Sequence, residues 1–235
     1  MQLSINSLLG FSVYASDGEV GKIEETYFDD RNWMIRYLVV QTGQWLSGRK
    51  VLISPLAFDR SKWEGGTFPV SLTKKQIMNS PDVNTNGPLS LQHTKSLNEY
   101  YLWQPFTDNE FYVPVHGDPP DLTEKPPVNT SSADNIHLRS TRETRGFRIY
   151  ATDGEIGFVH GFIVEDESWK IIYLLVVAKS IFGDQKILIS VQDIRKVKWN
   201  ESKIYLDISV KAVEQCRIFD GSMVVDHDKV STVFI

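Results

Sequence analysis

The residues Tyr14-Ala-Ser-Asp-Gly-Glu-Val-Gly21 return as Tyr150-Ala-Thr-Asp-Gly-Glu-Ile-Gly157, 136 positions further along the chain. The same shift, with no gap, aligns further positions: Trp33 with Trp169, Tyr37 with Tyr173, Leu52-Ile-Ser54 with Leu188-Ile-Ser190, and Trp63 with Trp199. Between residues 10–54 and 146–190, 18 of 45 positions are identical, where unrelated segments match at about 6%. The chain therefore contains two copies of one domain.

Length and composition indicate a globular protein of two small domains. The chain has 235 residues, of which 41% are apolar and 23% charged. The repeat predicts a first domain at 1–80, a connector at 81–136 and a second domain at 137–235. The net charge of −5 and pI near 5.6 predict no nucleic-acid partner, because phosphate binding needs clustered Lys and Arg.

Targeting signals and cysteine usage predict a cytoplasmic protein. The first ten residues lack the basic and apolar regions of a signal peptide. No continuous apolar stretch is long enough to span a bilayer, so we expect no membrane insertion. The single cysteine, Cys216, is typical of a reducing compartment.

Each copy is predicted to form short strands separated by turns. Asp17-Gly18 and Asp153-Gly154 are expected to make hairpin turns, with both glycines at positive φ. The runs 33–41 and 169–177 are rich in β-branched and aromatic residues, which favours strands. A short helix closes each copy, with Thr73 and Ser209 as expected N-caps. The predicted fold is mainly β: two tandem small antiparallel β-barrels, each closed on itself, with short helices.

The connector differs from both copies in composition. Eight of the ten prolines lie between Pro81 and Pro127, which is typical of a linker. The aromatic tract 97–112 is expected to be partly helical and to dock on the first barrel, whereas 116–134 is expected to be mobile. The apolar C-terminal end, Val233-Phe-Ile235, is expected to add a strand to a barrel.

The repeated pattern Gly-Phe-x-x-Tyr-Ala-x-Asp-Gly-Glu-x-Gly, then Trp-x-Ile-x-Tyr-Leu-x-Val, then Lys-x-Leu-Ile-Ser, resembles the PRC-barrel family over about residues 5–80 and 137–215. That family is named for the cytoplasmic barrel of the photosynthetic reaction centre H subunit. The leading His137-Leu-Arg-Ser140 resembles the tandem, stand-alone members, which are mostly prokaryotic. The resemblance implies a non-catalytic adaptor.

Two repeated features have both a structural and a functional interpretation. Asp17-Gly-Glu19 and Asp153-Gly-Glu155 could hold a divalent cation, although hairpin chemistry accounts for them better. The acidic turns 29–30 and 165–167 are expected to be solvated tips. The repeated tryptophans and tyrosines could line a ligand pocket, but their equivalence in both copies favours barrel core.

The apolar hairpin tips are the candidate interaction sites. Trp45-Leu46 and Ile181-Phe182 align under the 136-residue shift without being identical. Apolar residues at a tip, where polar ones are expected, predict a surface that meets a protein partner. The alternative is that each tip folds onto its own barrel or onto the other copy.

No catalytic, metal-binding or phosphate-binding motif is present, and the five histidines are scattered along the chain. We therefore expect no enzyme, no cofactor and no metal. The predicted function is a non-catalytic adaptor or assembly protein that binds protein partners, either as a monomer with an internal pseudo-two-fold or as a homodimer. The alternatives are a ligand- or metal-sensing protein with a site between the barrels, and a peripheral factor of a photosynthetic or other membrane complex.

Overall fold

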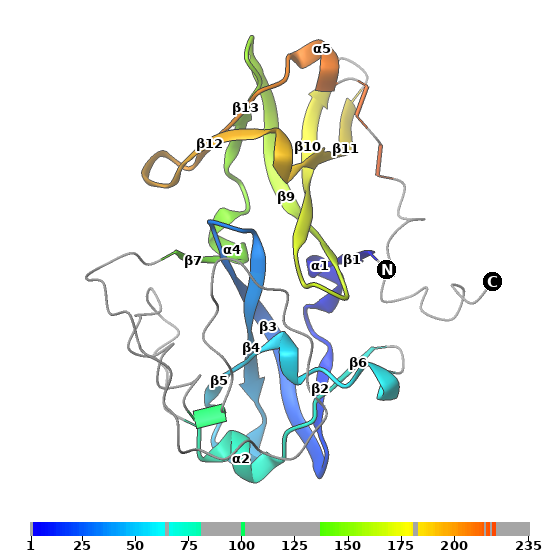
Figure 1. Ribbon diagram of the computed structural model, residues 1–235, viewed down its shortest axis with the longest axis vertical. Coiled ribbons are helices and arrows are strands. Elements are labelled where there is room, and N and C mark those ends of the chain that lie inside the picture. The colour runs from blue at the N-terminus through cyan, green and yellow to red at the C-terminus, as the bar shows by residue number, and fades with distance from the viewer. Residues whose placement is uncertain are drawn as a thin grey trace, which may run out of the picture.

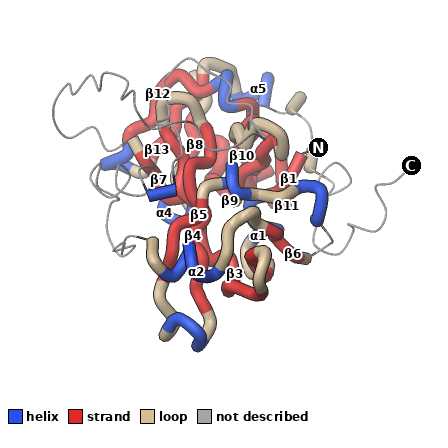
Figure 2. The backbone as a smooth tube through the Cα atoms, turned by 60° about the horizontal axis from the view of Figure 1, so that its bottom comes forward, coloured by secondary structure: helices blue, strands red, loops and turns tan. Residues whose placement is uncertain are grey.

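The two copies form two lobes stacked along the long axis of the molecule (Figure 1). This computed structural model describes residues 2–63, 66–80, 100–101, 137–180, 183–213, 215–216 and 218–219. The fold is mainly β, as predicted, and the short helices lie around the strands (Figure 2).

The first copy forms a sheet in the strand order β5-β4-β3-β2-β6. Its elements are β1 (Gln2–Ser4), α1 (Ile5–Leu8), β2 (Ser12–Ala15), β3 (Gly18–Asp29), β4 (Met34–Thr42), β5 (Lys50–Ile53), β6 (Thr67–Pro69) and α2 (Lys74–Met78). The side chain of Thr73 caps α2, as the sequence predicts, and completes a capping box with Gln76.

The second copy repeats this arrangement in the order β11-β10-β9-β8-β13-β12. Its elements are β7 (Leu138–Ser140), α4 (Thr141–Thr144), β8 (Arg148–Tyr150), β9 (Glu155–Glu165), β10 (Ile171–Ser180), β11 (Gly183–Ser190), β12 (Ile194–Lys198), β13 (Lys203–Leu206) and α5 (Val210–Val213). Equivalent strands therefore occupy equivalent places in the two sheets.

The repeated glycines in the Asp-Gly-Glu-x-Gly motif have different structural roles. Gly18 adopts a φ of 137°, as expected for the hairpin, but Gly154 does not have a positive φ. The second glycine of the motif is required by close approach: a Cβ on Gly21 would lie 2.0 Å from the Gln41 carbonyl oxygen, and one on Gly157 would lie 1.9 Å from that of Val177. Both glycines lie where β3 or β9 crosses close to its neighbouring strand.

The two copies exchange their first strands. β1 pairs antiparallel with β9 of the second copy, with Leu3 opposite Val164. In the same way β7 pairs with β3 of the first copy, with Arg139 opposite Phe28. The exchanged segments lie at the waist between the lobes (Figure 1). Each sheet therefore contains a strand of the other copy, which the expectation of two barrels closed on themselves did not include.

One hydrophobic core runs through both copies. Among the described residues, a single cluster of buried side chains includes Leu3, Ile23 and Phe68 of the first copy together with Phe162, Ile189 and Ile204 of the second. Because the main apolar cluster is continuous across the waist, we expect the two copies to unfold as one cooperative unit.

Candidate functional site

The backbones of the two copies meet at the turns that precede β4 and β10. The amide of Ile35 donates to the carbonyl of Trp169 at 2.8 Å, and the amide of Ile171 donates to the carbonyl of Trp33 at 2.7 Å. These reciprocal bonds flank an antiparallel bridge between Met34 and Lys170. Both tryptophans adopt left-handed backbone, with φ of 60° and 56°. The turns therefore form a pseudo-symmetric contact at the centre of the junction.

Aromatic side chains fill the space around this contact. Trp169 is buried and lies 5.9 Å from Phe58 and 5.7 Å from Phe68, both in the first copy. Phe28 stacks on Trp33 at 5.3 Å and lies 5.7 Å from Phe162 in the second copy. These rings belong to the shared core, so the core interpretation of the repeated tryptophans is confirmed, although the core joins the copies instead of lying within each barrel.

The aspartates of the acidic turns are largely buried at the junction, so the prediction of solvated tips is wrong for Asp29, Asp30 and Asp166. It holds for Glu165 and Glu167, which are exposed. Asp30 accepts hydrogen bonds at 2.8 Å from Nδ1 of His137 and from Nε of Arg139, both in the second copy. Its equivalent, Asp166, has a fully buried side chain and lies 2.5 Å from Nη2 of Arg60 in the first copy. Cations from the opposite copy therefore compensate both carboxylates, which satisfies the requirement that buried charges be paired.

Asp29 strengthens the first of these turns from within its own copy. Burial alone would raise the pKa of this carboxyl, but hydrogen bonds from Arg31 and the charge of Arg36 outweigh it, and the pKa lies below its ordinary value. Nη2 of Arg31 lies 2.9 Å from the carboxylate, and Nη2 of the buried Arg36 lies 3.3 Å from it. The Asp29 carboxylate is therefore ionised at neutral pH and paired with both arginines.

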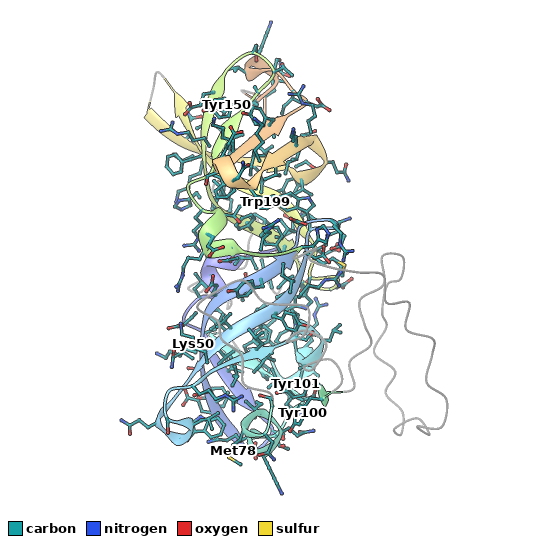
Figure 3. The ribbon with its side chains drawn as sticks, turned by 90° about the vertical axis from the view of Figure 1, so that its left-hand side faces the viewer. Lys50, Met78, Tyr100, Tyr101, Tyr150 and Trp199 are labelled. Atoms are coloured by element: carbon teal, nitrogen blue, oxygen red, sulfur yellow. The ribbon has the colours of Figure 1, made fainter. Side chains whose placement is uncertain are left out.

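Arg139 links this charge cluster to the aromatic core. Its guanidinium lies 4.5 Å from the ring centroid of Trp199, which Figure 3 shows near the meeting point of the lobes. Cation–π contact of this kind stabilises a partly desolvated cation.

The residues that meet across the junction differ between its two halves. In one half the hydroxyls of Thr26 and Thr141 are hydrogen bonded at 2.9 Å. The equivalent positions in the other half hold Phe162 and Ile5, both buried. One half of the junction pairs two polar side chains and the other half pairs two apolar ones. Two identical copies would instead place a polar side chain against an apolar one, so the first copy fits the second better than it would fit another first copy.

The close contact between Asn6 and Gly161 also favours pairing of the first copy with the second. A Cβ on Gly161 would lie 2.6 Å from the side chain of Asn6, which reaches across to donate to the His160 carbonyl at 3.2 Å. The position equivalent to Gly161 in the first copy is Glu25, whose carboxylate accepts from Ser140. If a first copy paired with another first copy, Asn6 would therefore meet a glutamate where it now meets a glycine.

The Thr26–Thr141 pair provides a test of this junction. Thr141→Val leaves the buried Thr26 hydroxyl without this partner and is expected to lower the free energy of unfolding by about 1–2 kcal/mol. Thr26→Val is expected to cost less, because the Thr141 hydroxyl keeps its hydrogen bond to the carbonyl of residue 26 at 3.2 Å. The double variant is expected to cost less than the sum, because two apolar groups can replace the pair, as Ile5 and Phe162 do at the equivalent positions. Urea denaturation of the four proteins measures the coupling, and strict additivity would mean that the hydroxyls do not interact.

The repeated aspartates cap helices. Oδ1 of Asp17 accepts from the backbone amide of Lys74 at 2.7 Å, and Oδ1 of Asp153 accepts from that of Val210 at 2.7 Å. Both amides belong to the first residue of a helix, where no intrahelical acceptor exists. Within the described part of the chain, no three His, Cys, Asp or Glu side chains gather as a metal-binding group. The structural interpretation of the motif therefore accounts for its repetition.

The predicted tip residues Trp45 and Leu46 lie partly buried against the core. Nε1 of Trp45 donates to the Val20 carbonyl at 2.7 Å, and Nζ of Lys74 lies 4.3 Å from its ring centroid. Ile181 and Phe182, the equivalent pair, lie outside the described residues. The first tip thus keeps only part of its apolar surface available for a partner.

Apolar outer faces of the two sheets are the feature that the sequence analysis missed. The first copy buries Tyr27, Tyr37, Val39 and Leu52 in a cluster separate from the main core. The second copy buries Ile163, Leu175 and Leu188, which are equivalent to three of these positions. The available signal was the apolar run within each central strand, residues 37–40 and 171–178, which indicates burial on both faces.

Residues from other parts of the chain cover both outer faces. Tyr101 and Leu138 pack on the first face, and Phe219 packs on the second. Tyr100 also donates its hydroxyl to the Gln76 carbonyl at 3.0 Å, and Figure 3 shows both tyrosines against the lower lobe. The expectation that the aromatic tract docks on the first barrel is confirmed for residues 100–101, the part of it that the structure describes.

The buried tyrosines of the first face predict a loss of stability in alkaline solution. Burial raises the pKa of Tyr101 to about 12, and burial with Glu25 and Glu143 nearby raises that of Tyr27 to about 12. Since the ordinary pKa is about 10, the unfolded state releases these protons first, and stability falls as pH rises between about 10 and 12. Thermal melts across this window should show a smaller fall for Tyr101→Phe, and parallel curves would contradict the burial of Tyr101.

Comparison with known proteins gives a match that covers the first copy. Residues 1–76 match the family model of the PRC-barrel domain, a generally non-catalytic domain family. A search of curated proteins found no match to the chain. No helix among the described residues is both long and apolar enough to cross a membrane.

Proposed function

We propose that the chain is a non-catalytic adaptor or assembly protein, in which two PRC-type barrels form one rigid body that binds protein partners. The observation that carries the proposal is the junction: exchanged strands, a shared core and buried ion pairs hold the copies in one relative orientation. A rigid pair of barrels can present two different surfaces at a constant separation, which is what an assembly factor requires.

The packing between the copies favours this role over the ligand-sensing alternative. The described residues fill the region between the barrels with aromatic core and ion pairs, for example Phe28 against Phe162 and Arg60 against Asp166. The proposal includes a cytoplasmic location, which the single free cysteine, Cys216, supports.

We further propose that the chain is a monomer with an internal pseudo-two-fold. Both exchanged strands find their acceptors within one chain, so the junction needs no second subunit. The complementary pairs Thr26–Thr141 and Asn6–Gly161 favour this pairing over pairing of like copies. Light scattering at micromolar concentration should give the mass of one chain.

Affinity capture from the native host tests the adaptor role. The full-length chain should recover a stoichiometric protein partner, and Leu46→Ser, on the proposed tip surface with Trp45, Ile181 and Phe182, should reduce its yield. Met78→Ser is the matched control, because Met78 is 43% exposed at the far end of the first lobe (Figure 3). Recovery of no partner under crosslinking would contradict the proposal. Equal yields from the two variants would mean that the tips are not the binding surface.

A further inference from the structure

The outer edge of β11 holds a short segment from beyond the repeated domain. β11 is the last strand of its sheet. Ile218 forms an isolated antiparallel bridge with Ile187, and the amide of Phe219 donates to the carbonyl of Lys186 at 2.8 Å. Residues 218–219 therefore extend the sheet by main-chain pairing, which is the geometry by which sheet edges accept peptides.

The same segment places an aromatic side chain on the apolar outer face. Phe219 packs on the cluster of Ile163, Leu175 and Leu188, with Ile172 and Tyr173 at its border. The three cluster residues come from the neighbouring strands β9, β10 and β11, so Phe219 packs on the outer face at this end of the sheet. The site thus combines an edge that binds backbone with an apolar surface that binds a ring.

Among the described residues, the contacts of this segment are the two main-chain links to β11 and the packing of Phe219. Ile218 is 59% exposed, so its side chain contributes little to the contact. In contrast, the first face is covered by Tyr101, whose pKa is raised by burial, and the adjacent chain is tied down by Arg49, which donates to the carbonyls of Met78 and Ser80. We therefore expect that displacing the covering segment requires less free energy at the second face than at the first.

We propose that the edge of β11 and the outer face of β9, β10 and β11 form a strand-acceptor site, and that Ile218–Phe219 occupy it until a partner replaces them. The partner is a protein with an extended segment that carries an aromatic residue, because Phe219 is the side chain that the outer face now accommodates. This inference rests on the proposed adaptor function and names its binding site.

A peptide with the sequence of the segment provides the probe. Residues 213–221, with Cys216 replaced by Ser and a fluorophore at one end, are titrated with the full-length chain and followed by anisotropy. The wild-type chain should bind the peptide weakly, because the tethered segment competes at an effective concentration in the millimolar range. Phe219→Ala in the full-length chain should tighten binding by about tenfold or more, because the competitor is weakened.

Three controls locate the site. A peptide with Ala in place of its Phe should not bind. Leu188→Ala, added to Phe219→Ala, should weaken binding, whereas Met78→Ala should leave it unchanged, because Met78 lies on the other lobe. Circular dichroism establishes that each variant is folded.

Several outcomes would overturn the inference. A folded Phe219→Ala chain that binds the peptide no better than wild type would do so, as would equal binding of the Ala-substituted peptide. Dimerisation of wild type that is lost in Phe219→Ala would make a second copy the occupant and would also overturn it. If the peptide fails while affinity capture still recovers a protein partner, the adaptor function stands and the acceptor site alone is wrong.

Discussion

Gly157→Ala should destabilise the protein by about 3 kcal/mol or more, at the upper end of the range for forced overpacking. The new Cβ would lie 1.9 Å from the Val177 carbonyl oxygen and 2.9 Å from its carbon. Both are backbone atoms of the paired strand, so no side-chain movement relieves the clash. Gly21→Ala should have a similar effect, because its Cβ would lie 2.0 Å from the Gln41 oxygen. Urea denaturation measures both variants.

Gly43→Ala is the matched control for this prediction. Gly43 has a φ of −72°, and an added Cβ would lie 3.6 Å from the nearest atom, in the Trp45 ring. Its free energy of unfolding should stay within about 1 kcal/mol of wild type. A Gly157→Ala protein as stable as the Gly43→Ala protein would mean that β9 and β10 do not approach as described.

Trp169→Ala should lower the free energy of unfolding by about 3–5 kcal/mol, the range for removing a large buried aromatic side chain. Trp169, in the second copy, is 6% exposed and its ring contacts Phe58 and Phe68 of the first copy. Its φ of 56° also strains any residue other than glycine, so Trp169→Gly should recover up to about 1 kcal/mol relative to Ala. Denaturant titrations of both variants provide the comparison.

Phe158→Ala is the control for Trp169→Ala, because this aromatic side chain on β9 is 36% exposed. It should cost less than about 1 kcal/mol. If both substitutions cost the same, the junction would not be a major source of stability.

The sequence predicts the strands and turns because local patterns encode them. The β-branched runs become β4 and β10, and Thr73 caps its helix as expected. The exchange of β1 and β7 could not be predicted, since strands of three residues have no measurable periodicity and their partners lie in the other copy. Register over such distances depends on tertiary packing, which a single sequence does not report.

The acidic turns show why part of the candidate site was misjudged. Asp30 and Asp166 resemble solvated turn residues locally, and their cations, Arg139 and Arg60, are distant in sequence and not equivalent to each other. A signal was nevertheless present: the aspartate and the following tryptophan are identical in both copies. Turn chemistry alone does not require a tryptophan, so its repetition indicated a buried contact.

The central claim is that the two copies form one structural unit through exchanged strands. A protease recognition site inserted between residues 116 and 134 allows the connector of the folded, full-length chain to be cut. We predict that the two fragments then co-elute in size-exclusion chromatography at the mass of one chain and unfold together in a single thermal transition. Fragments that separate after cleavage, or that melt in two independent transitions, would contradict the account.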